Sequence, residues 1–376
     1  MKVTLNRSAF LEELATVQRA ISGKTTIPIL TGVKLTITES GLTLTGSNAD
    51  ISIETFLNVN NEKANMLIES TGSIVIQARF FNEIIKKLPE QTLTLELIEN
   101  NQVIITSGKA LFNVNGLNAE SYPQLPIVDD KTSFKLPARV LNKLISETVF
   151  AVSSQESKPI LTGVHLTLNN SQLLAVATDS HRLSQRKIEL DNVNQVFDVV
   201  IPGKSLLELS RSFKDEEELV DISIMDNQIL FRTETMNFYS RLLEGNYPDT
   251  NRLIPTSFNT EINFNVSNLL SAIDRASLLS HEGRNNIVKL SIDSENVTIY
   301  GNSPEIGNVE EKLSYLEVEG EPIVISFNPD YMKASLKSFG DIDITIRFIS
   351  PIRPFTLQPK DGDIEFIQLI TPVRTN

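Results

Sequence analysis

Residues 28–36 read Pro-Ile-Leu-Thr-Gly-Val-Lys-Leu-Thr, and residues 159–167 read Pro-Ile-Leu-Thr-Gly-Val-His-Leu-Thr. Eight of these nine positions are identical at an offset of 131 residues, which indicates an internal repeat. Val288-Lys289-Leu290-Ser291 is a weaker third copy, and Glu120-Ser121-Tyr122-Pro123 is echoed by Tyr247-Pro248. The chain of 376 residues therefore consists of three similar repeats of roughly 125 residues.

Each repeat contains two helical patterns and two hairpin patterns. Phe10, Leu14 and Val17 recur at helical spacing, whereas Val33 and Leu35 alternate with polar residues as in a strand. The pattern predicts an α+β fold of three repeated domains, each with two helices plus antiparallel sheets. Helices are expected in windows 6–24, 78–88, 138–148, 203–214, 266–284 and 329–338, and hairpin turns at 39–41, 99–101, 169–170, 226–227, 294–295 and 350–351.

Two segments without periodicity separate the repeats. Residues 118–131 and 244–255 contain proline together with Asp and Asn, which is typical of turns and linkers. We therefore expect three domains, and their bounds are residues 1–122, 130–247 and 256–376.

The charge is unevenly distributed. Against 34 Lys and Arg stand 47 Asp and Glu, a net charge of −13 that argues against a uniformly basic nucleic-acid binder. The six helical windows nevertheless sum to roughly +7, which leaves roughly −20 on strands and loops. If the helices share one face, that face is basic and suited to phosphate groups. The alternative is that these cations only solvate outer helix faces.

Several classes of function are excluded or disfavoured by composition. The chain has no Cys and only three His, so we expect no metal site and no disulfide. It has neither an apolar run of ~18 residues nor a signal peptide, and we expect a cytoplasmic protein. Ser22-Gly23-Lys24-Thr25 lacks the first glycine of a phosphate-binding loop. We expect no catalytic residues, no cofactor and no enzymatic activity.

Two alternatives come from other classes of function. Asp179 and His181 have the side chains of a hydrolase that works in a cleft, although no nucleophile motif accompanies them. A β-rich structural scaffold without DNA binding is the second alternative.

Three further motifs carry a family resemblance. Residues 175–183 read Ala-Val-Ala-Thr-Asp-Ser-His-Arg-Leu, residues 245–249 read Gly-Asn-Tyr-Pro-Asp, and residues 371–374 read Thr-Pro-Val-Arg. Together with the repeated motif, they make the whole chain resemble the bacterial beta sliding clamps. The resemblance implies a head-to-tail homodimeric ring around duplex DNA, and hence a nucleoid-associated protein. It also implies partners: the replicative DNA polymerase, a clamp loader, and repair proteins that carry a clamp-binding peptide.

Broken symmetry between the repeats points to the partner-peptide pocket. The second repeat has His181-Arg182-Leu183 where the first has Asp50-Ile51, so the fold itself does not require these residues. Ser180 replaces the usual glycine of the family, which narrows the pocket, and Thr371 and Val373 replace a common methionine, which makes it more rigid. By the resemblance, the pocket consists of Leu161, Thr178, Ser180, His181, Arg182, Leu183, Pro248, Arg252, Leu253, Asn328, Tyr331, Ile352, Pro354, Thr371, Pro372, Val373 and Arg374.

The resemblance also assigns two further surfaces. Twelve helices from two chains, spaced ~8–10 Å apart, would enclose a bore of about 25 Å, wide enough for a loosely held duplex. Pro159 and Ile160 stand where the family often has aromatic residues, so stacking on DNA is not expected there. The DNA-facing residues are Lys24, Arg79, Lys86, Gln155, Lys158, Lys204 and Arg211. The dimer interface joins Phe112 and Val114 of one chain to Leu278 and Leu279 of the other.

Overall fold

The repeated Pro-Ile-Leu-Thr-Gly-Val motif forms the same local structure twice in the computed structural model of the protein. Pro28–Thr31 and Pro159–Thr162 are single 3₁₀ turns, and each leads into a strand that begins with glycine. A Cβ atom on Gly32 would lie 2.5 Å from the Val75 side chain, so only glycine fits this close approach of two strands.

The structure describes residues 1–125, 133–190, 193, 195–225, 227–281, 286–293, 295–362 and 365–375. The predicted turn positions Asp226 and Ser294, the linker residues 126–131 and the last residues of the fifth helical window lie outside these ranges. The chain divides into two units: unit 1 contains Met1–Arg139 and Glu208–Leu242, and unit 2 contains Val140–Leu207 and Leu243–Asn376.

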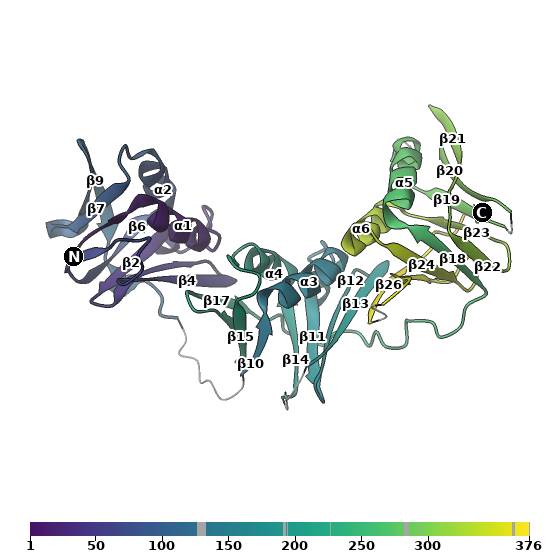
Figure 1. The fold of residues 1–376 in the computed structure, drawn as a ribbon, viewed down its shortest axis with the longest axis horizontal. Helices are drawn as coiled ribbons and strands as arrows, with labels where there is room; N and C mark the ends of the chain where they lie inside the picture. The colour runs from purple at the N-terminus through teal and green to yellow at the C-terminus, as the bar shows by residue number, and fades with distance from the viewer. Residues whose placement is uncertain are drawn as a thin grey trace. The chain divides into compact units, whose positions relative to one another are not determined.

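Unit 1 is built on one antiparallel sheet of 13 strands, in the order β10-β15-β16-β17-β4-β3-β2-β6-β9-β8-β7-β1-β5. Figure 1 labels several of them, among them β2, β4 and β17. Strand β17 of the second repeat pairs with β4 of the first, so the sheet continues from one repeat into the next. The strands are β1 (Lys2–Asn6), β2 (Gly32–Thr38), β3 (Gly41–Ser47), β4 (Ile51–Asn58), β5 (Leu67–Ser70), β6 (Gly72–Gln77), β7 (Thr92–Leu97), β8 (Gln102–Ser107), β9 (Ala110–Leu117), β10 (Ser133–Pro137), β15 (Leu219–Ile224), β16 (Gln228–Arg232) and β17 (Met236–Arg241).

Two helices, α1 (Arg7–Gln18) and α2 (Ala78–Lys87), pack against each other in unit 1. The Asn6 side chain caps α1 by accepting hydrogen bonds from the backbone amides of Ser8 and Ala9, because those amides have no partner within the helix. Phe10 of α1 and Phe81 of α2 are both fully buried and meet edge to face, with ring centroids 5.7 Å apart.

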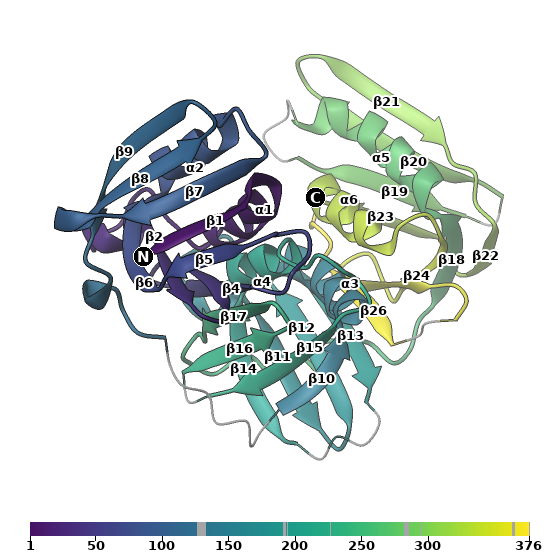
Figure 2. The same cartoon turned by 60° about the vertical axis from the view of Figure 1, so that its left-hand side comes forward.

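Unit 2 contains two antiparallel sheets, visible in Figure 2. The nine-stranded sheet has the order β14-β11-β12-β13-β26-β25-β24-β18-β22, and β26 of the third repeat pairs with β13 of the second. Its strands are β11 (Gly163–Asn169), β12 (Gln172–Thr178), β13 (Arg182–Glu189), β14 (Phe197–Pro202), β18 (Thr260–Asn265), β22 (Glu317–Gly320), β24 (Asp343–Phe348), β25 (Phe355–Pro359) and β26 (Phe366–Ile370). The four-stranded sheet has the order β21-β20-β19-β23, with β19 (Val288–Ile292), β20 (Val297–Ser303), β21 (Gly307–Lys312) and β23 (Ile323–Phe327).

Helices α5 (Val266–His281) and α6 (Pro329–Phe339) pack against each other in unit 2, as Figures 1 and 2 both show. They cover a core of buried aliphatic and phenylalanine side chains drawn from both sheets. The remaining helices are α3 (Ala138–Thr148) and α4 (Gly203–Ser210). Two helices per repeat and antiparallel sheets confirm the predicted fold class. Two helical windows were too long, since α1 ends at Gln18 rather than at residue 24 and α4 ends at Ser210 rather than at residue 214.

Candidate partner-binding site

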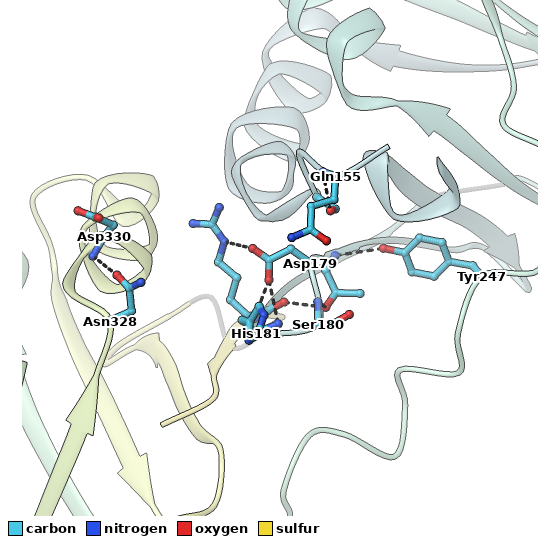
Figure 3. A network of polar contacts seen from close by, with 10 residues as sticks. Gln155, Asp179, Ser180, His181, Tyr247, Asn328 and Asp330 are labelled. Carbon is cyan, nitrogen blue, oxygen red and sulfur yellow. Dashed lines mark hydrogen bonds and ion pairs between the residues drawn. The ribbon is translucent and has the colours of Figure 1, made fainter. Parts of the chain in front are cut away.

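The turn between β12 and β13 is held by the side chain of Asp179 (Figure 3). Its Oδ1 accepts hydrogen bonds from the backbone amides of His181, at 2.9 Å, and Arg182, at 3.0 Å. Its Oδ2 accepts a third from Arg182 Nε at 3.0 Å. Thr178 Oγ1 closes the turn by donating to the Arg182 carbonyl at 2.7 Å. A single carboxylate therefore shapes the turn and fixes the guanidinium.

Ser180 occupies the tip of this turn with φ at +79°. Backbone in this region favours glycine, because a Cβ atom crowds the following carbonyl. The serine amide donates to Thr178 Oγ1 at 3.1 Å, and the residue is exposed. The resemblance expects glycine at position 180, and the positive φ there gives a physical reason for that preference.

Arg182 lies close to two aromatic rings. Its Cζ is 4.9 Å from the centroid of the Tyr331 ring and 5.5 Å from that of Phe150. His181 is stacked on Tyr331 with ring centroids 5.9 Å apart. Burial and the Asp179 carboxylate raise the pKa of Tyr331 above its usual value, in that order of importance. The cluster presents a guanidinium, an imidazole and aromatic surface together, a combination suited to orienting a peptide.

Tyr247 supports the turn from the opposite side, as Figure 3 shows. Its hydroxyl accepts a hydrogen bond from the Thr178 amide at 3.1 Å, and burial raises the pKa of this tyrosine well above its usual value. Its ring stacks on His165, with centroids 4.7 Å apart. Sequence reasoning missed Tyr247 and Phe150 as positioning residues, although the recurrence of tyrosine at 122 and 247 was a signal for the first.

The C-terminal segment runs alongside the turn. The Thr371 amide donates to the His181 carbonyl at 2.9 Å, and the Val373 amide donates to the Ser326 carbonyl of β23 at 2.7 Å. Pro372 is buried and Arg374 is exposed. The structure therefore brings the predicted residues Thr178 to Arg182, Tyr331 and Thr371 into direct contact.

The other predicted pocket residues have various roles in unit 2. Leu161 is buried, and Leu183 packs against Leu369 in a small apolar cluster. The Asn328 side chain caps α6 by accepting from the Asp330 amide at 2.8 Å. Pro248, Arg252, Leu253 and Ile352 are exposed, and Pro354 is half-buried.

The seven predicted DNA-facing residues are all exposed. Arg79, Lys86 and Lys204 lie on helices α2 and α4, Arg211 directly follows α4, and Lys24, Gln155 and Lys158 lie in loops. Arg79 lies over the Phe80 ring, and Arg211 pairs with Glu208 at 3.0 Å.

Comparison with known proteins matches the whole chain to one family. The models that describe the N-terminal, central and C-terminal domains of the DNA polymerase III beta subunit match residues 1–126, 135–249 and 251–374, respectively. The beta sliding clamp of Streptococcus pneumoniae serotype 4 is 51% identical over 374 residues, which cover 99% of each chain.

The chain belongs to the beta sliding clamp family.

Two further relatives agree with this assignment. The beta sliding clamp of Bacillus subtilis is 49% identical over 379 residues and 100% of both chains. The crystal structure of the DNA polymerase III beta chain of S. pneumoniae superposes with a TM-score of 0.97 at 50% identity, covering 100% of both chains.

The residues predicted for the dimer interface of this clamp-family chain are on its surface. Phe112 is exposed and Val114 half-buried on β9, and Leu278, with 70% of its surface exposed, lies with half-buried Leu279 near the end of α5. Leu111, beside Phe112 on the same strand, is 61% exposed.

The hydrolase alternative has no support in this family or in the geometry. The Asp179 carboxylate faces the Arg182 side chain and two backbone amides, and it meets His181 through that residue's amide. Within the described ranges, no group of three Asp, Glu or His side chains is arranged to hold a metal ion. None of the helices described is both long and apolar enough to span a bilayer.

Proposed function

We propose that this chain is a DNA sliding clamp that encircles duplex DNA as a head-to-tail homodimer and tethers the replicative polymerase for processive synthesis. The observation that carries this proposal is the match of all three domains to the clamp family. Each chain contributes three clamp domains, residues 1–122, 130–247 and 256–376. The protein acts by binding alone, without catalysis of its own.

Exposed cations on helices and loops support the DNA-binding part of the proposal. Lys24, Arg79 and Lys204 are free to meet phosphate oxygens through water, as a sliding contact requires. Arg211 and Lys86 have the carboxylates of Glu208 and Glu83 at 3.0 and 3.8 Å, respectively. These carboxylates weaken the attraction of the two cations for phosphate groups. Weak and numerous contacts hold a duplex without a preferred register.

The turn of Asp179 and the C-terminal segment support the proposed binding of partner proteins. A peptide with apolar anchors would pack on Tyr331 and the exposed Leu253, while Arg182 and backbone groups would orient it. Polymerase, clamp loader and repair proteins would compete for this one site.

Two exposed sheet edges support the dimer. Strand β9 pairs with β8 and at its end with β6, and β21 pairs with β20. Within the described residues, the rest of each strand's other edge has no paired strand and is open to a partner. Exposed Phe112 lies on β9, and exposed Leu278 lies on α5, the helix that contacts β21. A heterologous contact of β9 with β21 of a second chain would close a ring.

Retention on circular DNA tests the proposal. The protein is loaded by a bacterial clamp loader onto a nicked plasmid, and the complex is separated by gel filtration. We expect the protein to stay with the circle and to leave after one restriction cut. Equal retention on circular and linear DNA would contradict topological binding. The relative from B. subtilis serves as the loading control.

Truncation of the C-terminus tests the peptide site. Deletion of residues 372–376 removes the bond between the Val373 amide and Ser326. It should abolish binding of a labelled polymerase peptide and leave the dimer intact in sedimentation. Deletion of residues 375–376 alone is the matched control and should bind normally. Loss of the dimer in the longer deletion would argue against this pocket.

A further inference from the structure

Unit 1 contains a cavity of about 340 Å³ where the first repeat meets strand β17 of the second. Leu30 and Ile51 supply apolar walls, the loop at Asn48 forms one side, and Tyr239 of β17 forms another. All of its lining residues belong to unit 1. None of them belongs to the surfaces assigned above.

The loop of Asn48, which lines this cavity, occupies in the first repeat the position that the turn of Asp179 occupies in the second. Asn48 Oδ1 accepts from the amides of Asp50, at 2.8 Å, and Ile51, at 2.9 Å, as Asp179 Oδ1 does from His181 and Arg182. The Arg241 amide donates to the Asp50 carbonyl at 2.9 Å, as the Thr371 amide does to the His181 carbonyl. The backbone frame of the partner site is therefore built twice in one chain.

Tyrosines complete the correspondence. Buried Tyr122 directs its hydroxyl toward the Ser47 backbone, as Tyr247 does toward Thr178. A buried tyrosine therefore lies against the loop of Asn48, as another does against the turn of Asp179.

The two frames carry different side chains. Asp50 stands in the place of His181, and Ile51, only 6% exposed, in the place of Arg182. Ile27, 49% exposed, replaces Lys158 at the rim. Asp50 and Arg241 are exposed, and no ion pair in the described part of the chain engages either side chain. Among the described residues, the lip thus offers one charge of each sign without an ion-pair partner, beside apolar walls.

We propose that this cavity binds a short extended peptide whose apolar anchor is flanked by one basic and one acidic residue. The inference rests on the proposed function, because the repeat-related frame is expected to take a peptide. The anchor would pack against Leu30 and Ile51, a basic residue would face Asp50, and an acidic one would face Arg241. Such peptides would not compete with those at the turn of Asp179, so one chain would hold two partners at once.

Two labelled synthetic peptides test the assignment on the full-length protein. Both contain adjacent Leu and Phe, flanked in one by Lys and Glu and in the other by serines. We expect the charged peptide to bind about fivefold tighter, and Asp50→Asn or Arg241→Gln to remove that preference. Ile27→Asp, at an exposed position, should weaken both peptides at least about tenfold. Methyl signals of Ile27 and Ile51 should shift on binding.

Leu253→Asp is the matched control, since it alters the exposed rim of the other site and should leave the preference for the charged peptide unchanged. Absence of saturable binding overturns the proposal. So does binding that responds to Leu253→Asp and not to Ile27→Asp. Failure of the proposed function would appear separately, as equal retention of the protein on circular and linear DNA.

Discussion

The Asp179 carboxylate has two roles, shaping the turn and holding the Arg182 guanidinium, and two substitutions separate them. Asp179→Asn keeps an Oδ1 acceptor for the amides of His181 and Arg182 but removes the charge that faces Arg182 Nε. Asp179→Ala removes both. The first repeat contains the same turn with Asn48, which shows that an amide oxygen suffices for the backbone geometry.

The magnitudes follow from the burial of the ion pair. The side chains of Asp179 and Arg182 are only 12% and 14% exposed. Their charge-assisted hydrogen bond therefore contributes more to the free energy of folding than an exposed ion pair does. We expect Asp179→Asn to cost about 1–2 kcal/mol of local stability, because only the bond to the Arg182 guanidinium loses its charged acceptor. Asp179→Ala should cost about 3–4 kcal/mol, since two amides also lose their acceptor.

Amide hydrogen exchange and peptide binding report the two tasks. The His181 and Arg182 amides should exchange about 10–100-fold faster in Asp179→Ala than in Asp179→Asn. A labelled polymerase peptide should bind both variants more weakly, because Arg182 is no longer fixed over Tyr331. Asn48→Asp is the control and should leave this binding unchanged. If Asp179→Asn exchanged as fast as Asp179→Ala, or bound the peptide normally, the separation of tasks would be refuted.

Three further predictions concern packing, assembly and pH. Gly301→Ala would place a Cβ atom 2.3 Å from the backbone of α5 and should cost about 1–3 kcal/mol in thermal unfolding, whereas Gly23→Ala, with nothing within 4 Å, should be neutral. Leu278→Lys should weaken the dimer about 10–100-fold in sedimentation without unfolding the chain, because this side chain is 70% exposed in the single chain. Burial raises the pKa of Tyr122 and Tyr247, so their stabilising contribution is complete below about pH 10 and is lost above it. Absorbance at alkaline pH should show these two tyrosines ionising only as the protein unfolds.

Periodicity predicted the repeated fold because most helices and strands bury one regular face. It failed at the end of α1. Beyond Gln18 the backbone continues through tighter bonds, from the Ala20 amide to the Val17 carbonyl and from the Ile21 amide to the Gln18 carbonyl. Ala20 is fully buried, so the apolar spacing still resembled a helix.

The candidate site was predictable where symmetry between repeats is broken and where motifs resemble a family. His181 and Arg182 were found in this way. Phe150 was not, because its contact with Arg182 depends on how a segment after α3 packs against the turn. The repeated cavity of unit 1 was also missed, since its apolar and polar residues match ordinary core and loop positions in sequence.

The pairing of β17 with β4 and of β26 with β13 sets limits on how this protein can be dissected. Each junction between sequence repeats is bridged by a ladder of backbone hydrogen bonds. A fragment cut at a linker would keep its own helices and lose the strand that covers its sheet edge. Such an edge recruits any available strand, so isolated repeats should self-associate.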